Sequence, residues 1–354
     1  MELIPAFVIA YSDSSFTNPH EVARPDDPPD CRGSFTHMGA KYWGFETLRH
    51  KATQIAEGGQ GYRFDHHAFH WIHLGFHQPA AVSRITVSTR WFTGNQVPEI
   101  AIELKSGENR REVLARTPLQ PDSEHSFDIP ATAAGECIIR CYHEGGIARI
   151  NCFGELIGSG TRPPNLLEQA RISHVSNDHY GKPADAVTGN REVDYMLGWE
   201  SARTGFGEQA LFHLNKPARI ESIVVDTYMH RLNPPLSCHI YGINTTDVES
   251  AMMQQPRYEI EFDDGTTVLP DNFQAYMTAE AYLDEPVADN SRFGIRLHNP
   301  APSLWFPLVG FGQLRADTWH HFQDIEYREP VTHILYMHYP NGGIHGLKVY
   351  GSES

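Results

Sequence analysis

Two glutamate–arginine pairs are the residues in this sequence whose types and spacing first point to chemistry. Glu46 and Arg49 lie in the segment GFETLR, and Glu200 and Arg203 lie in GWESAR. A carboxyl group can transfer protons, and the planar guanidinium of arginine matches a carboxylate ligand. Each pair could therefore anchor a small anionic substrate and move protons on it. The alternative is an ion pair that only holds a loop in place, which is common and adds little stability.

Both pairs belong to a sequence repeat. The segments YHEGGIARINCFG, 142–154, and YPNGGIHGLKVYG, 339–351, share a tyrosine, a Gly-Gly-Ile core and an aromatic residue followed by glycine. Upstream, YSDSSF matches VSNDHY, and Asn95 matches Asn233 at an offset of 138 positions. The same order of motifs in both halves predicts two copies of one structural unit.

The boundary between the copies is expected near GSGTRPPN, 158–165, because glycine and proline break regular structure there. We predict a first repeat over 1–158 and a second repeat over 165–354, with an insertion around 254–323 that lengthens the second copy. Segments such as VSRITVSTRWF bring β-branched residues to one face, and long amphipathic helices are lacking. The pattern predicts an all-β fold of sandwiches or jelly rolls.

The composition excludes several classes of protein. The chain has 354 residues, with 28 lysines and arginines against 44 aspartates and glutamates, a net charge of -16. Such a surface repels phosphates, so we expect no nucleic-acid partner. Five cysteines without a Cys-x-x-Cys pair argue against a disulfide framework or a zinc ribbon. The N-terminal segment lacks a basic start, and no apolar run approaches a membrane span, so we expect a cytoplasmic protein with no membrane partner.

Histidines are numerous, 21 in all, and several gather in DHHAFHWIHLGFH, 65–77. Zinc enzymes commonly place two histidines around a glutamate as H-E-x-x-H, and this spacing does not occur here. P-loop, dinucleotide-binding and G-x-S-x-G motifs are lacking as well. We therefore expect packed or surface histidines rather than a metal site, and no cofactor.

The order of motifs resembles the allantoicase family, whose repeat carries S-D-x-x-F, G-W-E-T-x-R, G-N-x-P and P-D-G-G-[IV]-x-R. Their counterparts here are SDSSF at 12–16, GFETLR at 44–49, GNQVP at 94–98 and HEGGIAR at 143–149, and each recurs with changes in the second half. The resemblance covers nearly the whole chain outside the insertion. It implies two tandem jelly-roll, galactose-binding-like β-sandwich domains. It also implies hydrolysis of allantoate to ureidoglycolate and urea.

Allantoate is a small carboxylate with two ureido groups, so its site needs a cation, amide partners and an acid–base group. We predict two sets of site residues. The catalytic set is Asp13, Glu46, Arg49, Glu144, Glu200 and Arg203. The substrate-binding set is Phe16, Asn95, Arg149, His179, Arg231, Asn233, Asn341 and Trp305.

The second copy departs from the family pattern. The acid of P-D-G-G is Glu144 in the first copy but the neutral Asn341 in the second. The arginine that ends the motif is Arg149 in the first copy, and Gly346 stands at its place in the second. These changes predict that the first repeat keeps the ancestral type of pocket.

Another family position is an acidic residue just before a strand. We assign it to Ala68 in the first copy and to Glu208 in the second. The loss of polar groups at several such positions predicts weak or absent turnover of allantoate and activity on a relative of it.

Two other functions remain open at this point. A repurposed enzyme of secondary metabolism could guide a cyclisation, dehydration or pericyclic step on an apolar metabolite by positioning alone. Trp43, Trp91, Tyr228, Trp305 and Trp319 could supply an aromatic pocket for it. A non-catalytic carbohydrate-binding module is the third reading, because fold does not decide function. The expected partner is a small-molecule substrate, and a homo-oligomer is compatible with the sequence.

Overall fold

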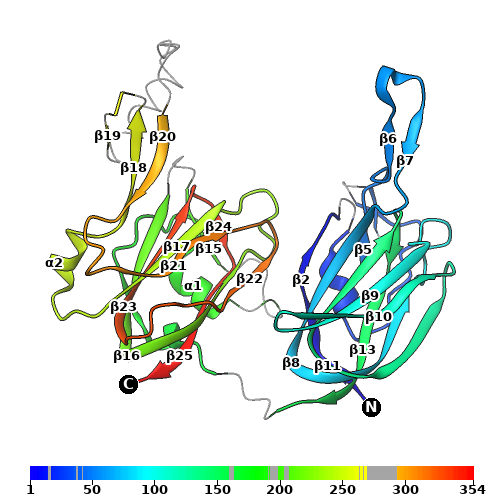
Figure 1. Ribbon diagram of the computed structural model, residues 1–354, viewed down its shortest axis with the longest axis horizontal. Coiled ribbons are helices and arrows are strands. Elements are labelled where there is room, and N and C mark those ends of the chain that lie inside the picture. The colour runs from blue at the N-terminus through cyan, green and yellow to red at the C-terminus, as the bar shows by residue number, and fades with distance from the viewer. Residues whose placement is uncertain are drawn as a thin grey trace. The chain divides into compact units, whose positions relative to one another are not determined.

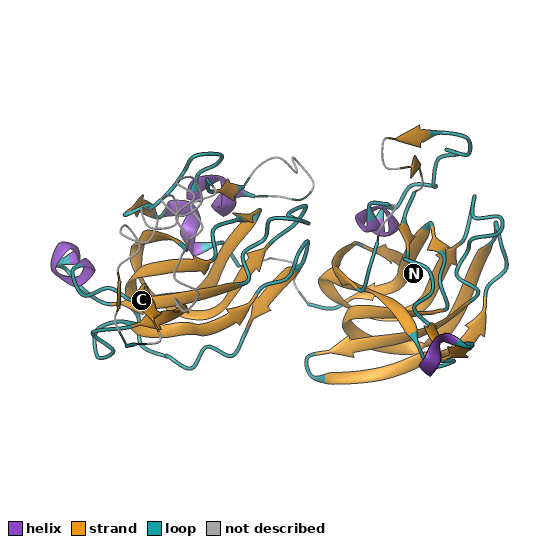
Figure 2. Cartoon of the chain, turned by 90° about the horizontal axis from the view of Figure 1, so that it is seen from above, coloured by secondary structure: helices purple, strands orange, loops and turns teal. Residues whose placement is uncertain are grey.

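The computed structural model contains two compact units, 1–162 and 163–354, each built around a seven-stranded antiparallel sheet (Figure 1). We call them the first and the second repeat. The structure describes residues 1–14, 17–36, 39–41, 43–158, 163–189, 191, 198–202, 207–262, 264–265, 267–268 and 293–354. Phe16 and Arg203, both predicted site residues, lie outside these ranges. The all-β prediction is confirmed, because strands dominate both repeats and the helices are short (Figure 2).

In the first repeat the strand order is β1-β13-β8-β11-β9-β10, and β2 also pairs with β8. The strands are β1 (Glu2–Ile4), β2 (Ala6–Tyr11), β8 (Phe69–Ser88), β9 (Glu99–Ser106), β10 (Asn109–Pro118), β11 (Glu124–Tyr142) and β13 (Arg149–Leu156). Register shifts interrupt the ladder between the long strands β8 and β11 near its middle. Such irregularities let a long strand bend, so that its two halves serve two packed layers.

Alternation along β8 explains why this segment is a strand. Ile72, Leu74, Ile85 and Val87 are fully buried, while intervening side chains are partly exposed. Successive side chains of a strand point to opposite faces, so these residues enter one core. Each such burial contributes about 2 kcal/mol, which is enough for the core to fix the strand register.

The second repeat has the same arrangement. Its strand order is β14-β16-β23-β17-β21, and β22 and β25 also pair with β16. Its strands are β14 (Arg171–Ser173), β16 (Glu208–Asp226), β17 (Ser237–Ile243), β21 (Phe306–Gln313), β22 (Trp319–Phe322), β23 (Val331–Tyr339) and β25 (Gly346–Glu353). Strands β16, β23, β17 and β21 thus correspond to β8, β11, β9 and β10 of the first repeat. The prediction that both halves have one strand order is confirmed.

The extra material of the second repeat overlaps the predicted range 254–323 but starts and ends earlier. Strands β21 and β22 fall inside that range, yet they pair in the main sheet as β10 and the start of β11 do. The additional segment therefore runs from the end of β17 to the start of β21, 244–305. Its described elements are α2 (Val248–Met252), β18 (Arg257–Phe262), β19 (Thr267–Val268) and β20 (Phe293–His298). Because β21 contains Pro307 and two glycines, its sequence predicts a loop rather than an edge strand.

This segment covers a face of the second sheet. Trp305 and Tyr258 from the segment form one buried cluster with Leu211, Leu335 and Met337 from β16 and β23. The first repeat has His73 and Arg140 at the places of Leu211 and Met337, as the paired registers show. Polar side chains of the first repeat thus have apolar counterparts in the second repeat where the segment packs.

Short elements complete both repeats. Two carry the predicted glutamates: β5 (Phe45–Glu46) pairs with β12 (Gly146–Ile147), and β15 (Trp199–Glu200) pairs with β24 (Gly343–Ile344). The others are β3 (Phe35–Thr36), β4 (Gly39–Ala40), β6 (Thr53–Ile55), β7 (Tyr62–Phe64), α1 (Pro183–Thr188) and the 3-10 helices Pro19–Ala23, Glu57–Gly59 and Leu166–Gln169. Among the described residues, the helices are all too short to cross a bilayer.

Candidate active site

Each repeat sets its predicted glutamate against the Gly-Gly turn. The short strand pairs place Glu46 opposite Gly146 and Glu200 opposite Gly343. The residue after each glutamate also bonds the Gly-Gly turn. The Thr47 hydroxyl accepts a hydrogen bond from the Gly145 backbone N–H at 3.0 Å, and the Ser201 hydroxyl accepts one from the Gly342 backbone N–H at 3.2 Å. Two motifs that lie far apart in sequence therefore meet at one edge of each sandwich.

A conserved geometry links each glutamate to the predicted asparagine. Asn95 Nδ2 donates to Glu46 Oε1 at 3.0 Å, and Asn233 Nδ2 donates to Glu200 Oε1 at 2.8 Å. Glu46 is 6% exposed, and its Oε2 has no hydrogen-bond partner among the described residues. Burial raises the pKa of Glu46, although the Asn95 hydrogen bond and the charge of Arg49 oppose the rise. Glu46 thus keeps a proton more readily than an exposed glutamate, which suits a proton donor.

Two acids hold the loop that carries Arg49. Asp13 Oδ2 accepts from the Leu48 backbone N–H at 2.5 Å, and Glu144 Oε2 accepts from the His50 backbone N–H at 3.0 Å. These bonds fix the backbone on both sides of Arg49. The described contacts of Asp13 and Glu144 therefore support a positioning role for these two residues, which were predicted to be catalytic.

The second repeat holds the corresponding loop with two neutral side chains. Asn177 Oδ1 accepts from the Ala202 backbone N–H at 3.1 Å, and Asn341 Nδ2 donates to the Ala202 carbonyl at 3.1 Å. Asn177 reproduces the bond of Asp13, because an amide oxygen accepts from a backbone N–H as a carboxylate does. Asn341 differs from Glu144: it donates to a loop carbonyl, which a carboxylate cannot do, whereas Glu144 accepts from an N–H.

The strand register corrects one assignment from the sequence. β8 sets His70 opposite Cys141, and β16 sets Glu208 opposite His338. His70, rather than Ala68, therefore occupies the place of Glu208, and the assignment of Ala68 is wrong by two positions. The constant offset of 138 between the repeats would have identified it.

A serine touches the side chain at this place in both repeats. Ser12 Oγ lies 3.3 Å from His70 Nδ1, and Ser176 Oγ donates to a carboxylate oxygen of Glu208. Burial is the main cause that lowers the pKa of His70, and the nearby charge of Lys51 lowers it further. His70 is thus held as a neutral imidazole where the second repeat has a carboxyl group.

Arg149 lies apart from Glu46. It is 3% exposed, and it donates to the backbone carbonyls of Asp26 at 2.7 Å and of Ala148 at 2.8 Å. The charges that act on it come from the segment around Asp26 and Glu21, not from Glu46. It lines a cavity of about 420 Å³ together with residues that include Ser88, Arg90, Trp91 and Asn151.

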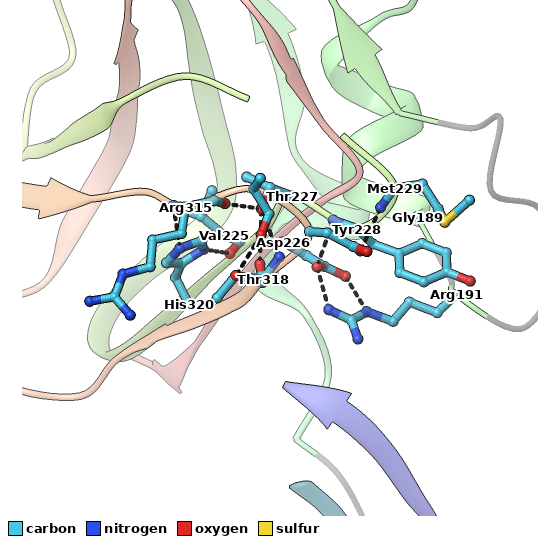
Figure 3. A network of polar contacts seen from close by, with 12 residues as sticks. Gly189, Arg191, Val225, Asp226, Thr227, Tyr228, Met229, Arg315, Thr318 and His320 are labelled. Carbon is cyan, nitrogen blue, oxygen red and sulfur yellow. Dashed lines mark hydrogen bonds and ion pairs between the residues drawn. The ribbon is translucent and has the colours of Figure 1, made fainter. Parts of the chain in front are cut away.

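The second repeat has a different arginine in the corresponding region (Figure 3). Asp226 stands at the place of Ser88 and is 1% exposed. Arg191, from the segment after α1, donates to both oxygens of Asp226 at 2.8 and 2.7 Å. Its guanidinium lies 4.9 Å from the ring centre of Tyr228 and 5.5 Å from that of Trp319. Two aromatic rings and a bidentate carboxylate therefore fix this cation.

Gly346 makes room for that ion pair. A Cβ atom on Gly346 would lie 3.0 Å from the Cβ of Asp226. The second motif thus has glycine where the first has Arg149, and a buried arginine from another segment lies in the corresponding region. Both repeats therefore contain a buried arginine, but at different positions in the sequence.

The family model described as the allantoicase repeat matches residues 2–157 and again residues 165–354. The chain belongs to the allantoicase family. A probable allantoicase from Pseudomonas fluorescens is 25% identical over 98% of this chain and 93% of its own length. The allantoicase of Saccharomyces cerevisiae is 22% identical over 97% and 90%. The crystal structure of an allantoicase from that yeast has a TM-score of 0.35, 19% identity and coverage of 98% and 90%.

Several residues that were predicted to bind substrate have other contacts. Arg231 pairs with the fully buried Asp317 at 3.3 Å. His179 is exposed on the surface. Trp305 is fully buried in the added segment and donates to the Ala251 carbonyl at 3.1 Å. Trp305 and Tyr228 are thus buried in the protein, and the half-buried Trp319 lies against Arg191, which weakens the alternative of an aromatic pocket for an apolar metabolite.

The allantoicase motifs did not reveal a group of histidines in the second repeat. They stand where the first repeat has apolar side chains, and the offsets between the repeats could have revealed them: His230, His338 and His345 for Phe92, Cys141 and Ala148. Within the described ranges, no three histidine, cysteine, aspartate or glutamate side chains are arranged to hold a metal ion.

The structure therefore sorts the predicted residues into groups. The first repeat brings together Asp13, Glu46, Arg49, Asn95 and Glu144, and the second brings together Glu200, Asn233 and Asn341. Arg149, Arg231, His179 and Trp305 have contacts outside these groups.

Proposed function

We propose that this chain is a hydrolase that acts, in its first repeat, on a small carboxylate carrying ureido or amidine groups, the class to which allantoate belongs. The observation that carries the proposal is the buried Glu46 carboxyl group, bound to Asn95 through one oxygen, with no partner on the other. Membership of the allantoicase family supports the same class of reaction.

The reaction breaks the bond between the central carbon and a ureido nitrogen, and a water oxygen takes the place of that nitrogen. The leaving nitrogen must gain a proton, and the water must lose one. Glu46 is suited to give the first proton, because burial raises its pKa. Its carboxylate can then accept the proton of the water, so that one group serves both steps.

The remaining groups suit the rest of the substrate. Arg49 lies on the loop that Asp13 and Glu144 clamp, and its charge acts on Glu46. A guanidinium there can pair with the substrate carboxylate. The side-chain carbonyl of Asn95 and nearby backbone groups can form hydrogen bonds with the ureido amides. Orientation of the substrate in this way lowers the barrier independently of the proton transfer.

Urea release by the purified chain tests the proposal, with allantoate and related ureido and amidine carboxylates as substrates. Glu46→Gln keeps the Asn95 hydrogen bond but cannot donate a proton, so we expect about a 100-fold loss of kcat. Arg49→Ala is expected to raise KM more than it lowers kcat for anionic substrates. Glu103→Gln is the matched control, since Glu103 is equally buried but pairs with Arg140 on another face.

Equal activity of Glu46→Gln and Glu103→Gln on every substrate would overturn the proposal. The absence of urea or ammonia release from the whole panel would do the same. Thermal unfolding of each variant separates a lost catalytic group from a lost fold.

A further inference from the structure

The second repeat contains a polar group of side chains that the first repeat lacks. His230 lies close enough to Glu200, His345 and His338 for their charges to act on its ring. The first repeat has the apolar Phe92, Ala148 and Cys141 at the places of the three histidines. The exchange of Phe92 for His230 places an imidazole beside Glu200, and an imidazole can transfer protons where a phenyl ring cannot.

A hydrogen-bonded path joins the histidine to the glutamate. Asn233 Nδ2 donates to Glu200 Oε1 at 2.8 Å, and the same asparagine hydrogen-bonds the ring of His230. A carboxylate that supports an imidazole through an intervening amide can stabilise the imidazolium form. Both His230 and Glu200 are partly exposed, so a small molecule can reach them.

The backbone around His230 is the same as in the first repeat. A Cβ on Gly146 would lie 2.1 Å from the ring of Phe92, and a Cβ on Gly343 would lie 2.1 Å from the ring of His230. Phe92 and His230 therefore occupy one position in two copies of one turn. The substitution changes the chemistry of the turn while its shape is kept.

The polar region extends beyond His230. Asp226 acts on the His230 ring by its charge, and it binds Arg191 through both oxygens (Figure 3). The ring of Tyr228 packs against His345 at 5.1 Å and under Arg191 at 4.9 Å. In the first repeat the apolar Phe92 stands at the place of this imidazole.

We propose that the second repeat is a separate acid–base site in which His230, supported by Glu200 through Asn233, hydrolyses a small ureido carboxylate. The neutral imidazole removes a proton from water as the water oxygen bonds to the carbon that carries the ureido nitrogen. The imidazolium gives that proton to the nitrogen as the carbon–nitrogen bond breaks. One water is consumed, and no other reactant is needed. The inference takes its substrate class from the proposed function but assigns the reaction to different residues.

The groups that face His230 set its pH dependence. Burial lowers its pKa first of all, Glu200, Asn233 and Asp226 raise it, and His345 lowers it. The net effect is a pKa below the ordinary value of 6.5, so the imidazole is a base at neutral pH. The activity of this site should fall on the acid side as His230 becomes protonated.

The test uses the full chain and allantoate, with urea release as the readout. In the Glu46→Gln background, we expect a residual activity that falls as the pH drops below 6.5. Adding His230→Phe, which restores the residue of the first repeat, is expected to lower this residual kcat about 100-fold. Adding His230→Gln instead is expected to abolish the fall of the residual activity at low pH. His333→Phe is the control, because His333 is a buried histidine of the same repeat that bonds Thr332.

The outcomes separate the two proposals. If Glu46→Gln removes all turnover, or if its residual turnover survives both His230 variants, the second site does not exist. If Glu46→Gln changes nothing while His230→Phe removes turnover, the second site stands and the first-repeat proposal fails. Loss of activity in His333→Phe as well would show that the variants act through folding, and would overturn the inference.

Discussion

His338 allows a quantitative test of how burial has changed the second repeat. Its side chain is fully buried, packs against Trp199 with ring centres 5.1 Å apart, and has no hydrogen-bond partner for either nitrogen among the described residues. The first repeat has Cys141 at this place. The perturbation is therefore His338→Cys, which substitutes a residue that the same fold already accommodates.

The sign of the effect follows from the pKa. Burial lowers the pKa of His338 from 6.5 to about 3. As the pH falls, the unfolded chain binds a proton at this residue long before the folded chain does, so protons favour unfolding. His338 therefore costs no pH-dependent stability above 6.5, and the cost grows as the pH falls from there toward 3.

The size of this loss of stability depends mainly on the protonation of His338 in the unfolded chain. Between pH 7 and pH 5 the folded imidazole stays neutral, while the unfolded one becomes almost fully protonated. Integration over this interval gives a loss of about 2 kcal/mol of unfolding free energy. His239 and His333, each 8% exposed with a pKa of about 4, add losses of the same sign. We expect the second repeat to unfold at a higher pH than the first.

Urea denaturation of the full chain at pH 7 and pH 5 measures the effect, with hydrogen exchange to assign each transition to a repeat. His338→Cys should make the second-repeat midpoint less sensitive to pH by about 1 M urea. His179→Cys is the control, since His179 is exposed in the same repeat. An unchanged pH sensitivity in His338→Cys would refute the reasoning, because it would mean that the folded chain protonates His338 near pH 6.

Two further substitutions test the ion pair and the turn of the second repeat. Arg191→Met leaves the buried carboxylate of Asp226 without its cation and should cost about 3–5 kcal/mol in chemical denaturation, whereas adding Asp226→Ser should recover most of the loss. A single variant as stable as the wild type would contradict this. Gly343→Ala places a Cβ 2.1 Å from the His230 ring and should cost about 1–3 kcal/mol, while Gly94→Ala, with open space, should be neutral. Equal melting temperatures would count against the described turn.

Much of the fold could be predicted from the sequence, because it depends on local patterns. The repeated Gly-Gly motifs and the alternation along 82–92 indicated strands and turns in both halves. The boundaries of the added segment could not be predicted, because β21 contains Pro307 and two glycines and looks like a loop. Only its pairing with β17 shows that it belongs to the main sheet.

The candidate site could be predicted only in part, for a physical reason. Glu46 and Asn95 were found because each lies in a motif that also makes a turn. Whether an acid is catalytic or holds a loop depends on its partners, and Asp13 bonds a backbone N–H. His230 was missed because its counterpart Phe92 is apolar, so neither residue belongs to a recognisable pattern of polar groups.

The two repeats show how a duplicated fold can separate structure from chemistry. A bond to the backbone survives in both copies where the side chain changes from Asp13 to Asn177, since each accepts from the corresponding N–H of the loop. The buried arginine comes from a different place in each copy: Arg149 belongs to the Gly-Gly motif, whereas Arg191 comes from another segment. A position that tolerates both a phenyl ring and an imidazole is therefore where divergence of function is expected. The exchange of Phe92 for His230 at this turn adds an imidazole beside the glutamate, and the strands that carry the turn stay the same.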